Sequence, residues 1–260
     1  MKKLITLLLI ILLLGSGFYV VNRYQNRNDI ENYEKMVTAI ADGYENFDEK
    51  VNLFKYNIDD VTLLEKAMSE VNNQIYYSNK NYKYHISKIG INDVLLEYNY
   101  YNGDMIDIVK CRQVQAETDN AITEFIASID TSKSQYEQIL EVHDKLIDLI
   151  DYDLSDSPSL DSYSIYGALV NNKAVCDGYS YTLIKILREL GISASYVGSE
   201  AMNHSWVMVQ YNNSNYYIDI TWDDPIALYG DMYVSNSISH QYFMITEDEL
   251  SKDHYDWTVE

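Results

Sequence analysis

Glycine, proline and cysteine are scarce in this sequence of 260 residues, which contains 10, 2 and 2 of them respectively. So few glycines and prolines argue against long flexible linkers between folded regions. Two cysteines, Cys111 and Cys176, are too few to hold together a disulfide-built fold of this length. We therefore expect both thiols to be free; a single bridge between them is the alternative.

Positive charge is also scarce, because 19 Lys and Arg residues face 40 Asp and Glu residues, which leaves a net charge of −21. A chain this acidic is repelled by phosphate backbones, and no basic stripe offsets the repulsion, so nucleic acid is not an expected partner. The histidines lack metal-ligand spacing and the acidic loops lack the EF-hand pattern, so no metal or cofactor is predicted. Acidic pairs such as Asp223 and Asp224 are interpreted as solvated loop charge.

Charge is absent from the run Leu4–Val21, which is mostly apolar and follows Lys2 and Lys3. Its length is about enough to cross a bilayer as a helix, and the two lysines favour a cytoplasmic N-terminus. We expect residues 1–23 to form a single transmembrane anchor in the cell membrane, with the main domain outside the cytoplasm. The alternative is a signal peptide whose cleavage leaves a secreted protein. No cysteine follows the run, which excludes lipoprotein processing.

The whole chain is 47% hydrophobic and 23% charged, a composition typical of globular proteins with one large or two small domains. Residues 24–118 show helical periodicity and then runs rich in β-branched and aromatic residues, which predict an α/β stalk or accessory region. It would consist of a helical hairpin, with Asp29 capping the first helix, and a small β segment. The expected helices cover residues 30–47 and 63–75, and the expected strands cover residues 82–87 and 94–101, followed by an Asn102-Gly103 turn.

A second domain is expected over residues 119–260, where Ser132 or Ser134 can cap a helix. Another helix begins at Cys176 and stops at Gly191. Three strand-like runs follow it, with a polar turn between the last two. We predict an α+β fold in which helices pack on an antiparallel sheet. The expected strands are residues 192–197, 205–211 and 216–222, and the turn is residues 212–215.

Three residues of this domain supply a nucleophile, a base and an orienting acid: Cys176, His204 and Asp219. A helix N-terminus stabilises a thiolate through its unpaired N–H groups and its dipole, and Cys176 is predicted at such a position. A hairpin that pairs residues near 205 with residues near 221 brings Asp219 close to His204. Each residue alone has a structural interpretation, as a small buried hydrophobe, a satisfied histidine or a paired acid. Their order and their secondary structure together favour a catalytic triad.

The sequence around these residues resembles the bacterial transglutaminase-like superfamily over about half of the chain, residues 130–257. The resemblance implies a papain-like core and an acyl-enzyme mechanism, in which Cys176 would attack an amide carbonyl, His204 would shuttle the proton and Asp219 would orient His204. The motifs that carry it are specific only in combination: Tyr166–Leu169, Val175–Ser180, His204–Trp206 and Asp219–Pro225, flanked by His143–Leu146, Tyr152–Asp153, Gln241–Phe243 and His254.

The resemblance also implies a protein or peptide substrate, whose acyl group passes to an amine or to water as in a transglutaminase, a protease or a deamidase. Partners at the cell surface are expected as well. Because the family includes inactive members, the alternative is a surface module without catalysis that binds peptide or cell-wall partners. One departure from the family pattern is Val207, where many relatives carry Asn.

Supporting roles fall to three aromatic residues near these motifs. Tyr166 is a candidate oxyanion donor beside the backbone N–H of Cys176, with packing as its alternative role. Trp206 and Trp222 are expected to shield the site from water.

Overall fold

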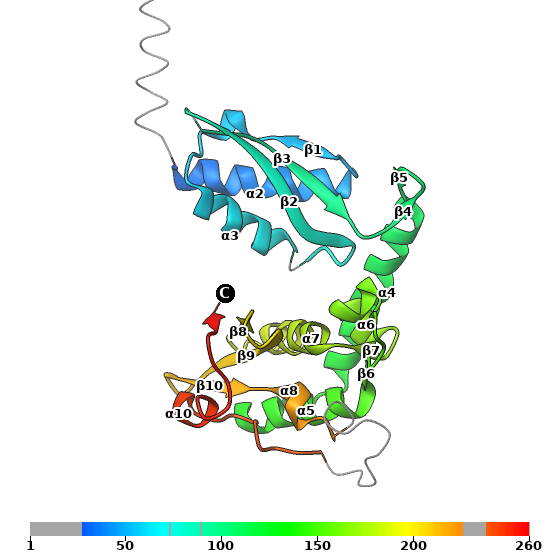
Figure 1. Cartoon of the computed structure of the whole chain (residues 1–260), viewed down its shortest axis with the longest axis vertical. Helices are drawn as coiled ribbons and strands as arrows, with labels where there is room; N and C mark the ends of the chain where they lie inside the picture. Colours follow the sequence, from blue (N-terminus) through cyan, green and yellow to red (C-terminus); the bar gives the residue numbers. More distant parts are fainter. Residues whose placement is uncertain (1–27, 73, 89, 226–237, 260) are drawn as a thin grey trace, which may run out of the picture. The chain divides into compact units, whose positions relative to one another are not determined.

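The computed structural model describes residues 28–225 and 238–259, apart from residues 73 and 89. These residues fall into two compact units, one ending at Ile108 and one beginning at Val109; Figure 1 shows the elements of each. The boundary expected near residue 118 falls inside helix α4 (Ile108–Ala127). The polar residues there occupy the exposed face of α4, whose buried stripe is Cys111, Val114, Thr118 and Ile122.

The predicted membrane anchor, residues 1–23, lies outside the described residues. Among the helices that the structure does describe, none combines the length and the apolar character needed to cross a bilayer.

The described residues of the first unit form two α-helices and a three-stranded antiparallel sheet, which is the mixed composition expected for this region. Asp29 caps the first helix as predicted, since its carboxylate accepts a hydrogen bond from the Glu31 N–H. The two helices are not joined by a short turn, because a strand and a 3₁₀ helix lie between them. In chain order the elements are α2 (Ile30–Glu45), β1 (Lys50–Asn52), η1 (Phe54–Tyr56), α3 (Val61–Asn72), β2 (Ser78–Ser87) and β3 (Gly90–Tyr98), and the sheet order is β1-β3-β2.

A small hairpin follows β3 where the sequence contains Asn102-Gly103. Strands β4 (Tyr101–Asn102) and β5 (Met105–Ile106) pair in antiparallel fashion. Gly103 has a φ of +66°, a conformation that glycine adopts without a steric penalty, so the turn signal is confirmed.

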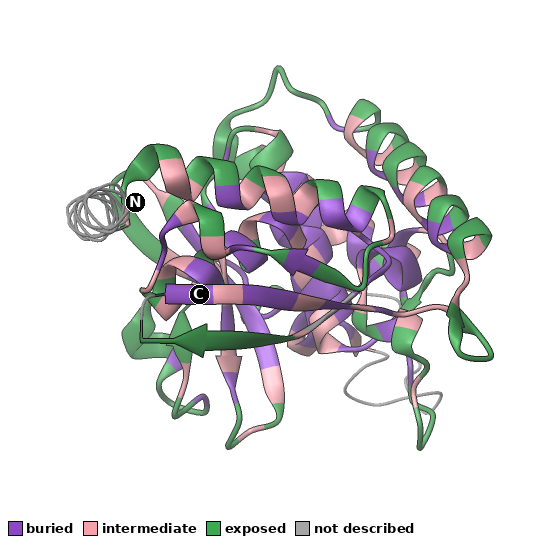
Figure 2. Ribbon diagram, turned by 90° about the horizontal axis from the view of Figure 1, so that it is seen from above, coloured by how far each residue is buried: buried purple, intermediate pink, exposed green. Residues whose placement is uncertain are grey.

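The second unit begins with a series of helices. Of the two candidate caps, Ser134 begins α5, where it forms a capping box with Glu137. Helix α7 begins at Cys176, and the chain turns at Gly191 with a φ of +76°, both as predicted. Buried and exposed residues alternate along the helices (Figure 2), as expected for amphipathic helices packed on one side. The helices after α4 are α5 (Gln135–Leu149), η2 (Leu160–Tyr163), α6 (Ile165–Leu169) and α7 (Cys176–Glu189).

The sheet of the second unit is antiparallel with the order β10-β9-β8-β11, and α7 packs against β8 and β9. The predicted turn between the last two expected strands is confirmed, since Asn212 and Asn213 have φ of 50° and 62°, as in a two-residue hairpin. This turn sets the register that pairs Ile218 with Val207. The strands are β8 (Ala194–Ser199), β9 (His204–Tyr211), β10 (Ser214–Ile218) and β11 (Thr258–Val259).

The last expected strand is shorter than predicted and does not include Asp219. Strand β10 ends at Ile218, and Asp219 is the N-cap of a short helix, α8 (Ile220–Asp223). Its side chain accepts hydrogen bonds from the N–H groups of Thr221 and Trp222, which turns the backbone out of the strand.

Two short strands hold the start of α7. Strand β6 (Asp151–Tyr152) pairs in parallel with β7 (Lys173–Ala174), which ends two residues before Cys176. The Val175 N–H donates to the Ser162 carbonyl at 2.9 Å. Gly178 lets these segments approach α7, because a Cβ at this position would lie 2.6 Å from the Ser162 carbonyl oxygen and 2.7 Å from the Ala174 Cβ.

We expect Gly178→Ala to destabilise the second unit by about 1–3 kcal/mol, because the added methyl group forces the backbone apart. In an open helix the same change stabilises by up to about 1 kcal/mol. Urea unfolding can be followed by tryptophan fluorescence, since Trp206, Trp222 and Trp257 all belong to this unit. Glu189→Ala, at the exposed end of the same helix, is the control and should change stability by less than about 0.5 kcal/mol. Equal effects of the two substitutions would contradict the close contact at Gly178.

Candidate active site

Cys176 lies at the first position of α7, after the N-cap Val175, whose side chain makes no capping hydrogen bond. The N–H groups of the first turn therefore have no side-chain acceptor at the cap, and they favour a negative charge at this end of the helix. Cys176 is partly exposed, whereas Cys111 is fully buried, and neither forms a disulfide. The two cysteines are not bridged, as expected.

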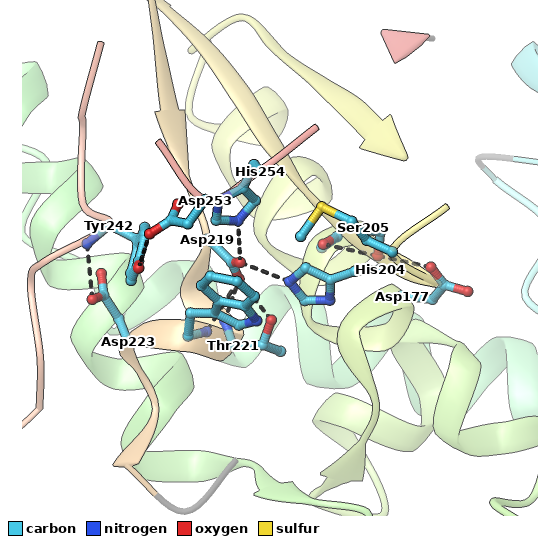
Figure 3. A network of polar contacts seen from close by, with 12 residues as sticks. Asp177, His204, Ser205, Asp219, Thr221, Asp223, Tyr242, Asp253 and His254 are labelled. Carbon is cyan, nitrogen blue, oxygen red and sulfur yellow. Dashed lines mark hydrogen bonds and ion pairs between the residues drawn. The ribbon is translucent and has the colours of Figure 1, made fainter. Parts of the chain in front are cut away.

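A hydrogen bond between neighbours of the two reactive residues ties α7 to β9. The Asp177 carboxylate, next to Cys176, accepts a hydrogen bond from the hydroxyl of Ser205, next to His204, at 2.8 Å (Figure 3). The same oxygen accepts the hydroxyl of Tyr196 at 2.7 Å. Because Asp177 and Ser205 directly follow the thiol and the imidazole in the chain, this bond restricts the distance between the two functional groups.

The structure brings His204 and Asp219 into direct contact, as the hairpin register predicts. His204 Nε2 lies 2.6 Å from Asp219 Oδ2, with the imidazole 11% exposed and the carboxylate fully buried. The second carboxylate oxygen accepts three hydrogen bonds, from the Thr221 N–H and hydroxyl and from the Trp222 N–H. Cys176 also lies near enough to the His204 imidazole to contribute to its raised pKa. The three predicted catalytic residues thus lie together, in the order thiol, imidazole, carboxylate.

His204 and Asp219 each shift the pKa of the other in the direction that favours its charged form. Burial acts to lower the pKa of His204, but the Asp219 carboxylate and the hydrogen bonds to Asp219 and Cys176 outweigh burial and raise the pKa to about 10. Burial acts to raise the pKa of Asp219, but the ion pair with His204 and the donors His254 and Thr221 hold it well below its usual range. At neutral pH the imidazole is therefore a cation beside the thiol, the arrangement that activates a cysteine nucleophile.

A second histidine, His254, contacts the same carboxylate and was not among the predicted site residues. His254 Nε2 lies 3.0 Å from Asp219 Oδ2, and His254 Nδ1 lies 2.8 Å from Asp253 Oδ1 (Figure 3). Its side chain is fully buried, whereas Asp253 is 41% exposed. The sequence signal for this residue was the motif resemblance alone, because Asp219 and His254 are 35 positions apart.

Tryptophan side chains enclose both histidines. Trp222 stacks on the His204 ring with centroids 5.5 Å apart and planes 20° apart, and it lies 4.3 Å from the His254 ring. Trp206 is fully buried and meets the His254 ring edge-on at 4.7 Å. The expected shielding by Trp206 and Trp222 agrees with these contacts, which exclude water from the faces of the imidazoles.

Comparison with known proteins agrees with this geometry. Residues 123–222 match the family model described as the transglutaminase-like superfamily. This segment is a transglutaminase-like domain. The resemblance drawn from the motifs is thereby confirmed, and Cys176, His204 and Asp219 all lie within the matched residues. Asp253 and His254 lie beyond them.

Solved structures give only a distant likeness. One is described as a TGase, at 18% sequence identity and a TM-score of 0.37, with 64% of this chain and 48% of that chain covered. Another is described as a putative cysteine protease from Cytophaga hutchinsonii, at 13% identity and a TM-score of 0.31, with 69% and 70% covered. The chain therefore spans about half the length of the TGase structure. No curated protein matches the chain.

Tyr166 is not part of the hydrogen-bond network around Cys176. Its side chain is buried, and its hydroxyl donates to Glu117 at 3.1 Å and accepts from Lys110 at 3.2 Å, both on α4. A packing role in the transglutaminase-like domain, the alternative for this residue, fits these contacts.

Tyr152 is the tyrosine that lies beside Cys176. Strand β6 pairs Tyr152 with Ala174, two residues before Cys176, and its ring lies 6.2 Å from that of Tyr179 in the first turn of α7. Burial and then the negative charges of Cys176 and Asp219 raise the pKa of Tyr152 to about 12. The hydroxyl therefore keeps its proton at neutral pH and can donate a hydrogen bond.

A second buried charge network contradicts the interpretation of Asp223 and Asp224 as solvated loop charge. Asp223 Oδ2 lies 3.3 Å from Nε2 of the fully buried His143, whose Nδ1 lies 2.8 Å from Asp144. Burial acts to lower the pKa of His143, but the two carboxylates outweigh it and raise the pKa. Asp224 is buried as well and accepts a tyrosine hydroxyl at 2.7 Å. A pair of acids in the sequence does not reveal such partners, which come from distant elements.

Two groups of described side chains each bring three potential metal ligands within 4.8 Å of one another. In each group the pKa of one histidine is raised by neighbouring carboxylate charge, which favours the protonated ring, and a protonated ring nitrogen has no lone pair for a metal ion. The charge state of these residues thus fits ion-pair networks better than metal centres. The groups are His143, Asp144 and His240, and His204, Asp219 and His254.

The raised pKa of His204 makes the stability of the transglutaminase-like domain depend on pH. A histidine whose folded pKa exceeds its unfolded value contributes stability that is complete below about pH 6.5 and is lost as the pH rises toward about 10. Between about pH 6.5 and 9.5 we expect the stability advantage of the wild type over His204→Gln to fall by more than about 1.4 kcal/mol, the equivalent of one pKa unit.

Urea unfolding at several pH values, followed by tryptophan fluorescence, measures this advantage. His240→Gln, the same substitution at a histidine that is 44% exposed, is the matched control. A constant difference between the wild type and His204→Gln would show that His204 is not held as a cation by Asp219.

Proposed function

We propose that the second unit is a thiol-dependent acyl-transfer enzyme that acts on protein or peptide amides. The observation that supports this most strongly is the buried Asp219–His204 ion pair, which makes the imidazole a cation beside the partly exposed thiol of Cys176. A histidine with a purely structural role can be satisfied by neutral hydrogen-bond partners. It does not require a buried carboxylate on one side and an unbridged cysteine at an uncapped helix N-terminus on the other.

In the proposed reaction the Cys176 thiolate attacks the amide carbonyl carbon, and the carbonyl oxygen becomes an oxyanion. His204 then donates its proton to the leaving nitrogen, the C–N bond breaks, and a thioester remains on Cys176. The neutral His204 next removes a proton from an amine or a water molecule, which attacks the thioester and regenerates the thiolate. Asp219 keeps the imidazole oriented and stabilises its charged form throughout.

The oxyanion needs hydrogen-bond donors that are already in place. The backbone N–H of Cys176 at the start of α7 is one such donor. We assign the second donor to the Tyr152 hydroxyl, which remains protonated at neutral pH and belongs to a residue whose backbone pairs with Ala174, two positions before Cys176. In this proposal Tyr152 replaces Tyr166, the residue predicted from the sequence, as the side-chain donor to the oxyanion.

We further propose that the enzyme works outside the cytoplasm, anchored in the membrane by residues 1–23. The support for this is the apolar run Leu4–Val21 behind Lys2 and Lys3. Partners at the cell surface, and a cationic character in the substrate, fit this location and the net charge of −21.

Alkylation of the two cysteines by iodoacetamide tests the nucleophile directly. We expect Cys176 to be labelled rapidly near pH 6, well below the free-thiol value of about 8.5, and His204→Ala to slow this labelling by about 10-fold or more. Cys111 is a control within the same molecule, since it is fully buried and should react only after unfolding. Equally slow labelling of Cys176 in the wild type and in His204→Ala would contradict the proposal.

The reaction type can be read by mass spectrometry of glutamine-containing peptides incubated with and without a primary amine. A peptidase cleaves the peptide, a deamidase converts an amide to an acid, and a transglutaminase adds the amine. Cys176→Ala should abolish every product while leaving the fold intact. Peptide binding without any product in the wild type would instead support the non-catalytic surface module.

Substitution of Tyr152 tests the oxyanion donor. We expect Tyr152→Phe to lower kcat by about 100-fold with little change in KM, the size of effect seen when one preorganised donor is removed. Tyr163→Phe is the matched control, because Tyr163 lies nearby on η2 but is 42% exposed. A kcat that is unchanged in Tyr152→Phe would remove this residue from the mechanism.

A further inference from the structure

His254 is a second imidazole on the carboxylate that orients His204. Both histidines place Nε2 against the same oxygen, Asp219 Oδ2, at 2.6 Å for His204 and 3.0 Å for His254. The other ring nitrogen of His254 faces Asp253 Oδ1 at 2.8 Å. Both hydrogen bonds can form together with ionised carboxylates only when both nitrogens of His254 carry protons.

The surroundings of His254 fix its position and place a carboxylate at each of its ring nitrogens. Its side chain is fully buried and enclosed by Trp206 and Trp222, so the ring cannot turn away into water. The charged or titratable groups that face it are the carboxylates of Asp219 and Asp253, the imidazole of His204 with centroids 6.1 Å apart, and the Tyr242 ring at 5.5 Å. The two carboxylates outnumber the one neighbouring cation.

Asp253 connects this buried row of charges to the surface. It is 41% exposed, and its Oδ2 accepts the hydroxyl of Tyr242 at 2.6 Å, which fixes the carboxylate that faces His254. From the surface inward, carboxylates and imidazoles therefore alternate and end at the thiol: Asp253, His254, Asp219, His204 and Cys176. Alternation of this kind lets each buried charge lie between charges of opposite sign.

We propose that His254 is a positioning residue: as a second cation on Asp219, it holds the carboxylate in place and weakens its hold on the proton of His204. This inference rests on the proposed function for its catalytic meaning, since it concerns how readily His204 gives its proton to the leaving group. A carboxylate oxygen that is shared between two cations attracts each of them less than it would attract one alone.

The expected consequence is specific to charge. Without His254, Asp219 would hold the His204 proton more firmly, and the imidazolium would be a weaker acid toward the leaving nitrogen. A purely structural role for His254 would reduce stability or the fraction of folded protein without changing the titration of His204. The titration of His204 is therefore the readout that separates the two roles.

The experiment is an NMR titration of the histidine side chains in the purified full chain labelled with ¹⁵N-histidine. In His254→Gln, which keeps a hydrogen-bond donor but removes the charge, we expect the titration of His204 to move upward by about one pH unit. In an Asp219→Asn background the same substitution should have a much smaller effect, because the shared carboxylate is absent. His240→Gln, the same change at a largely exposed histidine, is the control and should leave the titration of His204 in place.

The wild-type protein gives a second test that does not depend on the folding of any variant. At neutral pH the ¹⁵N shifts of His254 should show protons on both ring nitrogens. A neutral His254, or a titration of His204 that does not move in folded His254→Gln, would overturn the inference. These readouts do not depend on enzyme turnover. If they fail while Cys176 is alkylated rapidly, only the role of His254 is wrong. If they succeed while Cys176 is alkylated slowly, only the proposed function is wrong.

Discussion

A carboxylate without any exposed surface has to be neutralised and hydrogen-bonded, because an unpaired buried charge costs several kcal/mol. Asp219 meets this requirement by accepting five hydrogen bonds. Three come from the short helix that it caps, from the Thr221 N–H and hydroxyl and the Trp222 N–H, and one each comes from His204 and His254. These donors belong to β9, α8 and the segment after α10 (Glu247–Leu250). The segments that carry His204, Thr221, Trp222 and His254 must therefore be in place before Asp219 can be buried.

The Cys176 thiol is positioned by a different set of constraints. Cys176 follows β7, whose parallel pairing with β6 and the bond from the Val175 N–H to the Ser162 carbonyl fix the start of α7. The hydrogen bond between Asp177 and Ser205 then joins this helix end to the strand that carries the imidazole. The thiol and its base thus sit on two regular elements, a helix and a strand, and short polar contacts between their neighbours hold them together. Rigid elements of this kind keep reacting groups closer to a productive geometry than mobile loops do.

Local signals explain which features could be predicted from the sequence. The cap at Asp29, the start of α7 at Cys176 and the turn at Gly191 each depend on a few adjacent residues and were predicted correctly, and the cap at Ser134 was one of two candidates. The end of β10 was not, because an apolar run continues past Asp219 and only the capping hydrogen bonds of that side chain stop the strand. Partners from distant parts of the chain leave no local pattern, so the burial of Asp223 and Asp224 and the contact of His254 with Asp219 could not be read from the sequence.

The C-terminal segment belongs to the same compact unit as the candidate site, although the family match ends at residue 222. Backbone hydrogen bonds join Ile245 to Tyr217 in both directions, and the Asp219 N–H donates to the Tyr242 carbonyl at 3.1 Å. Strand β11 then adds to the edge of the sheet beside β8. Together these contacts give the segment a defined position and bring His254 to the one carboxylate that orients His204. If the segment were absent, Asp219 would lose a donor and part of its cover, and the ion pair at the centre of the site would be open to water, where it is weaker.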